Sequence, residues 1–200
     1  MPDITAAIAQ VRLFLDDTVA SHRVAPDSLD DMCDGVRKVF PASNKNLVSS
    51  TVKFSADGGA LTSVTPSDPV FGIVTLATAP TATLDLYYCY QYFVDADIQA
   101  FVDQGLAEMN FTEIDLATMP TALYTASAQF AAAFAYESLM GRFAKMYNVT
   151  AEGETFDKSD VYKSMKTAHD TLLTRAEKAR GDYWGNQNRS NRPASATSSS

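Results

Sequence analysis

The feature that most constrains the fold is a change of residue pattern that happens twice along the 200 residues. From Gly35 to Phe93, short runs of β-branched and aromatic residues alternate with Gly, Pro, Asn and Asp, which is typical of antiparallel strands joined by tight turns. On both sides of this stretch, apolar residues recur every three or four positions, which indicates helices. The sequence therefore predicts an α+β fold: a helical bundle (residues 1–34 and 94–180) with an inserted small antiparallel β-module (residues 35–93).

About five strands are expected in the β-module. Their predicted ranges are 36–40, 47–56, 60–64, 72–77 and 83–92. In the last of these runs Leu84, Leu86 and Tyr88 share one face with Tyr90, because successive side chains of a strand point to opposite sides. That face is expected to pack on the core of the module.

The first helix is expected close to the N-terminus. Its apolar face consists of Ile4, Ile8, Val11, Leu15 and Val19. The stretch from Ala25 to Asp34 follows, and its Pro, Ser and Asp content predicts a solvated acidic loop. Its carboxylate spacing does not match a calcium-binding loop, because Met32 stands where an oxygen ligand is needed.

Three further helices are expected after the β-module. Asp95 is expected to cap the first, and Thr118, with Pro120 in the first turn, to begin the second. Asp157 is expected to cap the last helix, with Phe156 and Val161 in the positions of a hydrophobic staple. The apolar seam of this last helix consists of Val161, Met165, Ala168, Leu172, Ala176 and Ala179.

Beyond Arg180 the chain is polar and lacks residues for a core, which predicts an extended C-terminal arm, residues 181–200. Tyr183 and Trp184 are the aromatic residues of this arm, and Arg189 and Arg192 follow them. Trp, Tyr and Arg dominate the binding energy of protein interfaces. The four residues are therefore interpreted as a partner-docking arm; the alternative is that they fold back onto their own chain.

The net charge of −8 is unevenly distributed. Residues 158–200 hold eight basic and four acidic side chains, whereas residues 1–157 hold eight basic and twenty acidic ones. Such an acidic body argues against diffuse nucleic-acid binding, which depends on Lys and Arg. Two cysteines, Cys33 and Cys89, are too few for a disulfide framework, and neither a signal peptide nor a membrane span is expected.

Residues for catalysis do not converge in any recognisable motif. His22 and His169 are the two histidines, and neither stands in a local motif with a nucleophile. The turn at Asp57-Gly58-Gly59 is not a phosphate-binding loop, because no Gly-Lys-Ser/Thr follows it. We therefore expect no enzyme, no catalytic residue, no metal site and no cofactor.

The order of these parts resembles the neck proteins of tailed bacteriophages, the head–tail connector or adaptor proteins beneath the portal. The resemblance covers most of residues 1–180 and depends on turn spacing and layout. It is carried by Asp34-Gly35, Phe40, Val52, Asp57-Gly58, Asp68, Gly72-Ile73-Val74-Thr75-Leu76, Ala79-Pro80, Tyr88, Tyr90 and Asp95-Ala96-Asp97-Ile98.

The resemblance implies a structural virion protein that forms a dodecameric ring with copies of itself. In that interpretation residues 181–200 dock on the portal protein, and the ring continues the DNA channel toward the tail or a tail-completion protein. DNA passes without sequence-specific binding, no membrane is involved, and the protein is located in the virion neck after assembly in the host cytoplasm. Two alternatives stay open: a tail-completion or other tail or neck ring protein, and a non-enzymatic ligand-binding module.

Overall fold

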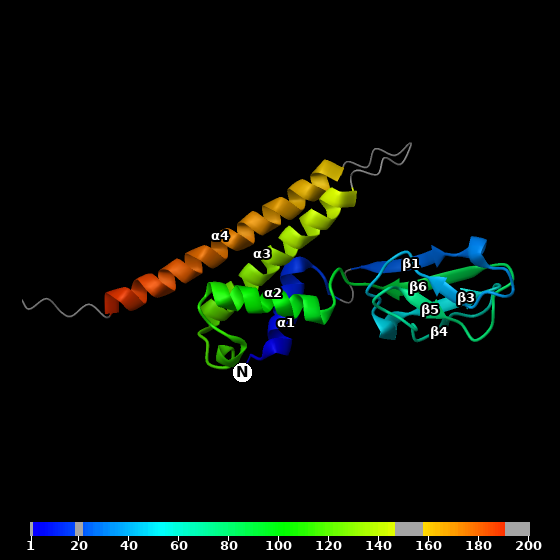
Figure 1. Cartoon of the computed structure of the whole chain (residues 1–200), viewed down its shortest axis with the longest axis horizontal. Coiled ribbons are helices and arrows are strands. Elements are labelled where there is room, and N and C mark those ends of the chain that lie inside the picture. Colours follow the sequence, from blue (N-terminus) through cyan, green and yellow to red (C-terminus); the bar gives the residue numbers. More distant parts are fainter. Residues whose placement is uncertain (1, 19–21, 147–157, 191–200) are drawn as a thin grey trace, which may run out of the picture. The chain divides into compact units, whose positions relative to one another are not determined.

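The chain folds into two compact units, described here from a computed structural model for residues 2–18, 22–146 and 158–190 (Figure 1). The helical unit comprises Met1–Leu15 and Ile98–Ser200, and the β unit comprises Asp16–Asp97. The α+β fold with an inserted antiparallel module is therefore confirmed. The predicted boundary at residue 35 is wrong, since the β unit begins at Asp16.

Four helices are seen among the described residues of the helical unit, and α3 packs against both α1 and α4 (Figure 1). They are α1 (Ile4–Leu15), α2 (Asp95–Glu108), α3 (Thr121–Met146) and α4 (Lys158–Ser190). The carboxylate of Asp3 accepts a hydrogen bond from the backbone N–H of Ala6 at 2.8 Å, which satisfies a free donor at the start of α1. Helix α1 ends at Leu15 because Asp16 adopts a left-handed φ of 51°, so the predicted continuation to Val19 is wrong and Val19 itself lies outside the described residues.

Small residues allow the helices of this unit to approach closely. Alanines form most of the buried face of α3, and Ala has both high helix propensity and little bulk. A Cβ atom built at Gly105 of α2 would lie 2.3 Å from the carbonyl oxygen of Ser127 in α3, so glycine is required there. The buried residues of α3 are Leu123, Ala126, Ser127, Ala128, Phe130, Ala131, Ala132, Ala133, Ala135 and Leu139.

The starts of α2 and α3 agree to different degrees with the predicted caps. Helix α2 begins at Asp95, within one residue of the predicted cap. Helix α3 begins at Thr121, and the carbonyl of Pro120 accepts the first backbone hydrogen bond, from Tyr124. Thr118 is therefore not the cap, because its hydroxyl donates instead to the carbonyl oxygen of Asp115. The predicted cap of α4, Asp157, and its staple partner Phe156 lie outside the described residues.

Residues 16–18 and 22–97 of the β unit include six short strands, all antiparallel, in two sheets. The order in the larger sheet is β1-β6-β3-β4, and β2 pairs with β5 in the smaller one. The strands are β1 (Arg23–Ser28), β2 (Val39–Pro41), β3 (Lys53–Ala56), β4 (Thr62–Ser63), β5 (Ile73–Thr75) and β6 (Leu84–Cys89). The predicted alternation in β6 is confirmed, since Leu84, Leu86 and Tyr88 are buried.

The prediction of a solvated acidic loop from Ala25 to Asp34 is wrong for the first part of the stretch, whereas Asp30, Asp31 and Asp34 are exposed beyond the strand. The first part belongs to β1, where Pro26 is tolerated because β1 is an edge strand. Asp27 is buried, and its carboxylate accepts hydrogen bonds from the hydroxyls of Tyr88 and Ser43, both at 2.7 Å. The carboxylate of Asp30 accepts one from the backbone N–H of Leu84 at 2.9 Å. These side chains tie the segment to the core.

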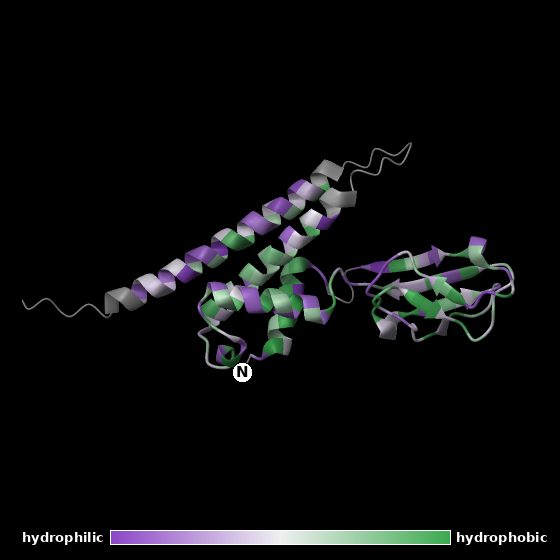
Figure 2. Ribbon diagram, viewed as in Figure 1, coloured by the Kyte–Doolittle hydropathy of each residue, from purple (hydrophilic) through white to green (hydrophobic). Residues whose placement is uncertain are grey.

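The C-terminal segment is helical further than predicted. Helix α4 continues to Ser190, so an extended conformation is wrong for residues 181–190, and residues 191–200 lie outside the described residues. Helix α4 carries hydrophilic residues along much of its length, whereas hydrophobic residues gather in α1 and the first half of α3 (Figure 2). The seam of α4 is fully buried at Leu172 and Ala176, while Val161 is 40% exposed.

Candidate protein-docking surface

Arg180 joins the C-terminal part of α4 to the other helices. Its guanidinium group forms an ion pair with the carboxylate of Glu108 at 2.9 Å and lies 5.2 Å from the centre of the Phe130 ring. The same group donates to the Glu108 carbonyl oxygen at 3.2 Å. Arginine therefore joins the end of α4 to both α2 and α3 through charge and cation–π contacts.

Beyond Arg180 the helix presents the predicted aromatic pair. The rings of Tyr183 and Trp184 are arranged edge to face, with centroids 5.2 Å apart, a geometry that aromatic rings favour. Trp184 remains 39% exposed, although tryptophan usually buries much of its surface. Gly181 and Gly185 lie on either side of the pair, and a Cβ atom at either would meet nothing within 4 Å.

The predicted docking residues therefore divide into three groups. Tyr183 and Trp184 are brought together on the exposed end of α4. The backbone of Arg189 belongs to the same helix, less than two turns further on. Arg192 lies outside the described residues. Tyr183 is half-buried and Trp184 is 39% exposed, so the pair is partly covered by its own chain.

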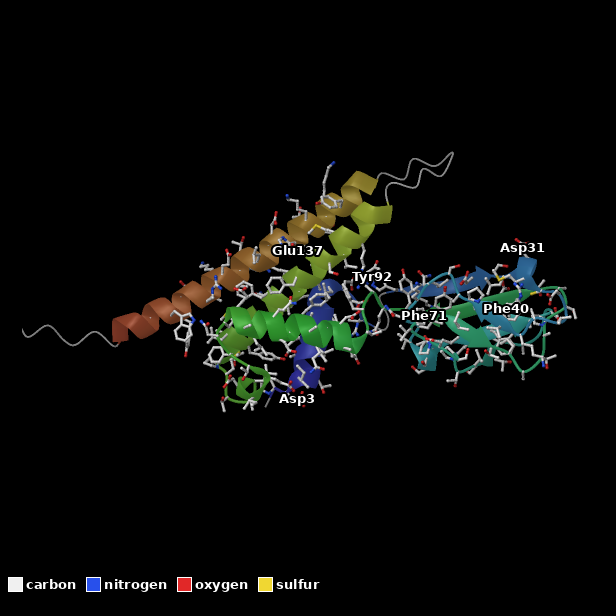
Figure 3. All side chains as sticks on the ribbon, viewed as in Figure 1. Asp3, Asp31, Phe40, Phe71, Tyr92 and Glu137 are labelled. Carbon is white, nitrogen blue, oxygen red and sulfur yellow. The ribbon has the colours of Figure 1, made fainter. Side chains whose placement is uncertain are left out.

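Two shallow grooves run along α4 within the helical unit. The α3–α4 groove, of about 590 Å³, contains charges of both signs, and Glu137 on α3 is labelled beside it (Figure 3). It is lined by Phe134, Glu137, Met140, Gly141, Tyr162, Lys166, His169, Asp170 and Leu173. The α1–α4 groove, of about 690 Å³, contains Arg175 as its single charged residue. It is lined by Leu13, Phe14, Ser164, Thr167, Ala168, Thr171, Leu172 and Arg175.

The two histidines occupy different surroundings. His169 contacts the carboxylate of its neighbour Asp170 at 2.8 Å on the surface of α4. His22 packs between the rings of Tyr90 and Tyr92, at centroid distances of 5.2 and 4.3 Å. Its Nε2 atom lies 3.5 Å from the carboxylate of Asp17, which is fully buried. Within the described part of the chain, no three His, Cys, Asp or Glu side chains come close enough to hold a metal ion.

The strongest pKa shifts belong to groups that hold the β unit together. Backbone N–H groups of Thr81, Ala82 and Thr83 donate to the carboxylate of Asp57 and lower its pKa to about 2. Burial, and then the neighbouring carboxylate of Asp27, raise the pKa of Tyr88 to about 12. These groups are structural, because each of their hydrogen bonds closes a turn or joins two segments of the same unit.

The cysteines are both free thiols and half-buried. Cys33 donates a weak hydrogen bond to the carbonyl oxygen of Leu29 at 3.5 Å. Burial, and then the nearby carboxylates of Asp30, Asp57 and Asp34, raise the pKa of this thiol. A raised pKa keeps the Cys33 thiol protonated and therefore a poor nucleophile.

Sequence reasoning missed two exposed apolar side chains of the helical unit. Ile114 is 90% exposed in the turn between α2 and α3, and Leu13 is 64% exposed at the end of α1. A signal for the first was present, because Thr112 and Asp115 have the spacing of a capping box around a single apolar residue. Leu13 had no such signal, since it stands two positions from both Val11 and Leu15 and therefore lies on the opposite side of the helix from the apolar face.

The described residues include no helix of the length and apolarity needed to cross a membrane. Comparison with known proteins gives no match to a protein family, to a curated protein or to a solved structure.

Proposed function

We propose that this protein is a structural protein of a tailed-bacteriophage neck, a head–tail connector whose copies form a ring between the portal and the tail. The end of α4 is the portal-docking element, and the role is architectural rather than catalytic. The proposal rests on the layout of the chain, in which both chain ends build a helical unit and the middle builds an inserted β unit.

The exposed Trp184 at the end of α4, in edge-to-face contact with the half-buried Tyr183, is the observation that carries the proposal. Trp184 lies one turn beyond Arg180, whose ion pair with Glu108 joins α4 to α2. The helix continues to Ser190. An exposed tryptophan on a rigid helix makes a large contact with little loss of conformational freedom. Such a residue, followed by arginine in the same helix, matches the composition of interface hot spots.

The distribution of charge supports the same proposal. The β unit, residues 16–97, contains eleven acidic and five basic side chains, whereas the remaining residues contain thirteen and eleven. A ring that presents acidic surface to its channel repels the phosphates of DNA, and the genome then slides through without being held. The more neutral helical unit is left for contacts with protein.

Truncation tests the docking element. A chain that ends at Arg180 keeps the buried seam residues Leu172 and Ala176 and the Arg180–Glu108 pair, so we expect it to fold. It should no longer bind the purified portal ring of its own phage in co-sedimentation. Unchanged binding by this truncated chain would overturn the proposal.

A pair of further variants locates the contact. Trp184→Ala should weaken portal binding by about thirtyfold or more, as hot-spot residues do. A chain that ends at Ser190 is the matched control, because it keeps the whole of α4. If the control binds as the full chain does, the contact lies on the helix; if it fails as the Arg180 truncation does, residues 191–200 make the contact and the aromatic pair does not.

A further inference from the structure

The turn between α2 and α3 holds an isoleucine out into solvent. The 3₁₀ turn Glu113–Asp115 is closed by a capping box, in which the backbone N–H and the hydroxyl of Thr112 donate to the Asp115 carboxylate at 2.7 and 2.9 Å. Leu116 and Met119 are buried directly after it. Because both sides of the turn are fixed, the 90% exposed side chain of Ile114 is held in place, and a preorganised apolar side chain loses little entropy on binding.

The α1–α4 groove is a concave surface, complementary in shape to the protruding side chain of Ile114. Leu13, Phe14 and Leu172 give it an apolar lining, and hydroxyl groups of α4 form much of its wall. Its volume of about 690 Å³ is in the range of sites that take up several side chains. Leu13 is 64% exposed at its edge, so apolar surface is left open to a partner.

The turn Glu113–Asp115 cannot reach the α1–α4 groove of its own chain. The hydroxyl of Tyr136 donates to the carbonyl oxygen of Phe14 at 3.4 Å, which places the groove beside this part of α3. The turn lies before Thr121, the first residue of α3. Fifteen residues of helix separate Thr121 from Tyr136, a distance of about 22 Å at 1.5 Å per residue.

Charge decides which of the two grooves the turn fits. Glu113 and Asp115 flank Ile114, so the protruding turn is acidic. The α1–α4 groove has Arg175 as its single charged residue. The α3–α4 groove contains two carboxylates and one lysine, Lys166, and this excess of negative charge would repel the turn.

We propose that the turn Glu113–Asp115 of one copy docks in the α1–α4 groove of a second copy, with Ile114 against Leu13 and Glu113 near Arg175. Two different surfaces meet in this contact, so it is heterologous, and repetition of such a contact closes a ring when the rotation between copies permits. This inference rests on the ring of the proposed function and names the surfaces that form it.

Charge reversal tests the contact in the full chain. Arg175→Glu and Glu113→Arg should each weaken self-association by about tenfold or more, measured by sedimentation velocity over a range of protein concentrations. The two variants mixed together should recover association, because Arg and Glu again face each other. Lys166→Glu, in the α3–α4 groove, is the control and should associate as the unmodified chain does.

Cross-linking tests the geometry independently of affinity. An Ile114→Cys chain mixed with a Leu13→Cys chain should give a covalent dimer with a short bis-maleimide reagent. The mixture of Ile114→Cys with Glu137→Cys, in the α3–α4 groove, should not, and neither should the unmodified chain with its native cysteines. A preference for Glu137→Cys, or a chain that remains monomeric up to its solubility limit, would overturn the inference.

Portal binding separates this inference from the proposed function. Charge-reversal variants that lose self-association but still bind the portal as single copies support both. A chain that forms the cross-linked dimer and does not bind the portal overturns the portal assignment and leaves the contact between copies in place. A chain that binds the portal without the Ile114–Leu13 cross-link overturns the contact.

Discussion

The two units are held together by different physical means. The helical unit depends on close approach of small residues, with alanines along α3 and a glycine in α2 against it. The β unit has strands of two to six residues, and carboxylates such as Asp27 and Asp57 join its loops to its strands. The helical unit therefore tolerates only substitutions that fit its close packing. The stability of the β unit depends instead on the hydrogen-bond partners of its carboxylates and on their protonation.

The largest loss of stability is expected at the close contact between α2 and α3, where no space is left for a further atom. Gly105→Ala places a Cβ atom 2.3 Å from the carbonyl oxygen of Ser127 and 2.9 Å from the backbone nitrogen of Ala131. Both neighbours are backbone, so the helices must separate, and we expect a loss of about 3 kcal/mol of stability. Hydrogen exchange measured by mass spectrometry should show faster exchange in α2 and α3 and unchanged exchange in the β unit.

Gly141→Ala is the matched control for this prediction. Gly141 lies in α3, and a Cβ atom there would meet nothing within 4 Å. Alanine has the higher helix propensity, so the substitution should stabilise the helix by up to about 1 kcal/mol. Equal losses in the two variants would show that glycine at position 105 is not required for close packing.

The second prediction concerns the polar cluster of the β unit. Tyr88→Phe removes the hydroxyl that donates to the carboxylate of Asp27 at 2.7 Å and accepts from the side-chain amide of Asn44 at 3.2 Å. Asp27 is buried and keeps its hydrogen bonds from Ser43, and the loss of one hydrogen bond to a charged group costs about 1.5–3 kcal/mol. Urea unfolding followed by hydrogen exchange should show this loss in the β unit.

Tyr87→Phe provides the comparison for Tyr88→Phe. Tyr87 is the next residue in β6, and its half-exposed side chain points to the opposite face of the sheet. Removal of its hydroxyl should change the stability by less than about 0.5 kcal/mol. A similar loss in both variants would contradict the role assigned to the Tyr88–Asp27 contact.

Periodic features were predictable from the sequence, and contacts between distant segments were not. The buried face of β6 and the start of α2 follow from local pattern. Strand β1 was missed because Pro26 and the acidic residues around it favour a loop locally, whereas pairing with β6 decides the outcome. The Asp27–Tyr88 contact spans 61 positions, and no local pattern encodes it.

The candidate docking residues also show how far local sequence patterns can predict the structure. Composition was sufficient to single out Tyr183 and Trp184, but the polar sequence around them predicted an extended arm. Helix α4 continues through this segment to Ser190, because a helix that is already formed adds each residue at little cost. The opening of the α1–α4 groove depends on how α1 packs, which the periodicity of a single helix does not reveal.

The smallest effect is expected from the titration of Asp57. Backbone N–H groups of residues 81–83 lower its pKa from an ordinary value near 3.9 to about 2. A carboxyl group with a lowered pKa in the folded state contributes stability that is complete above about pH 4 and is lost as the pH falls through about 2. The β unit should therefore become less resistant to urea between pH 5 and pH 2.

Asp57→Asn removes the titrating group and should flatten this pH dependence in the β unit, with urea midpoints measured from pH 5 to pH 2. Asp31→Asn, a change at an exposed carboxylate in the same unit, should leave the slope as it is in the unmodified chain. Unfolding of the helical unit should be the same in both variants, because Asp57 and its partners belong to the β unit. If the urea midpoint of Asp57→Asn kept its full dependence on pH, protonation of Asp57 would not be the cause of the loss of stability in acid. The two units would then differ in their packing alone.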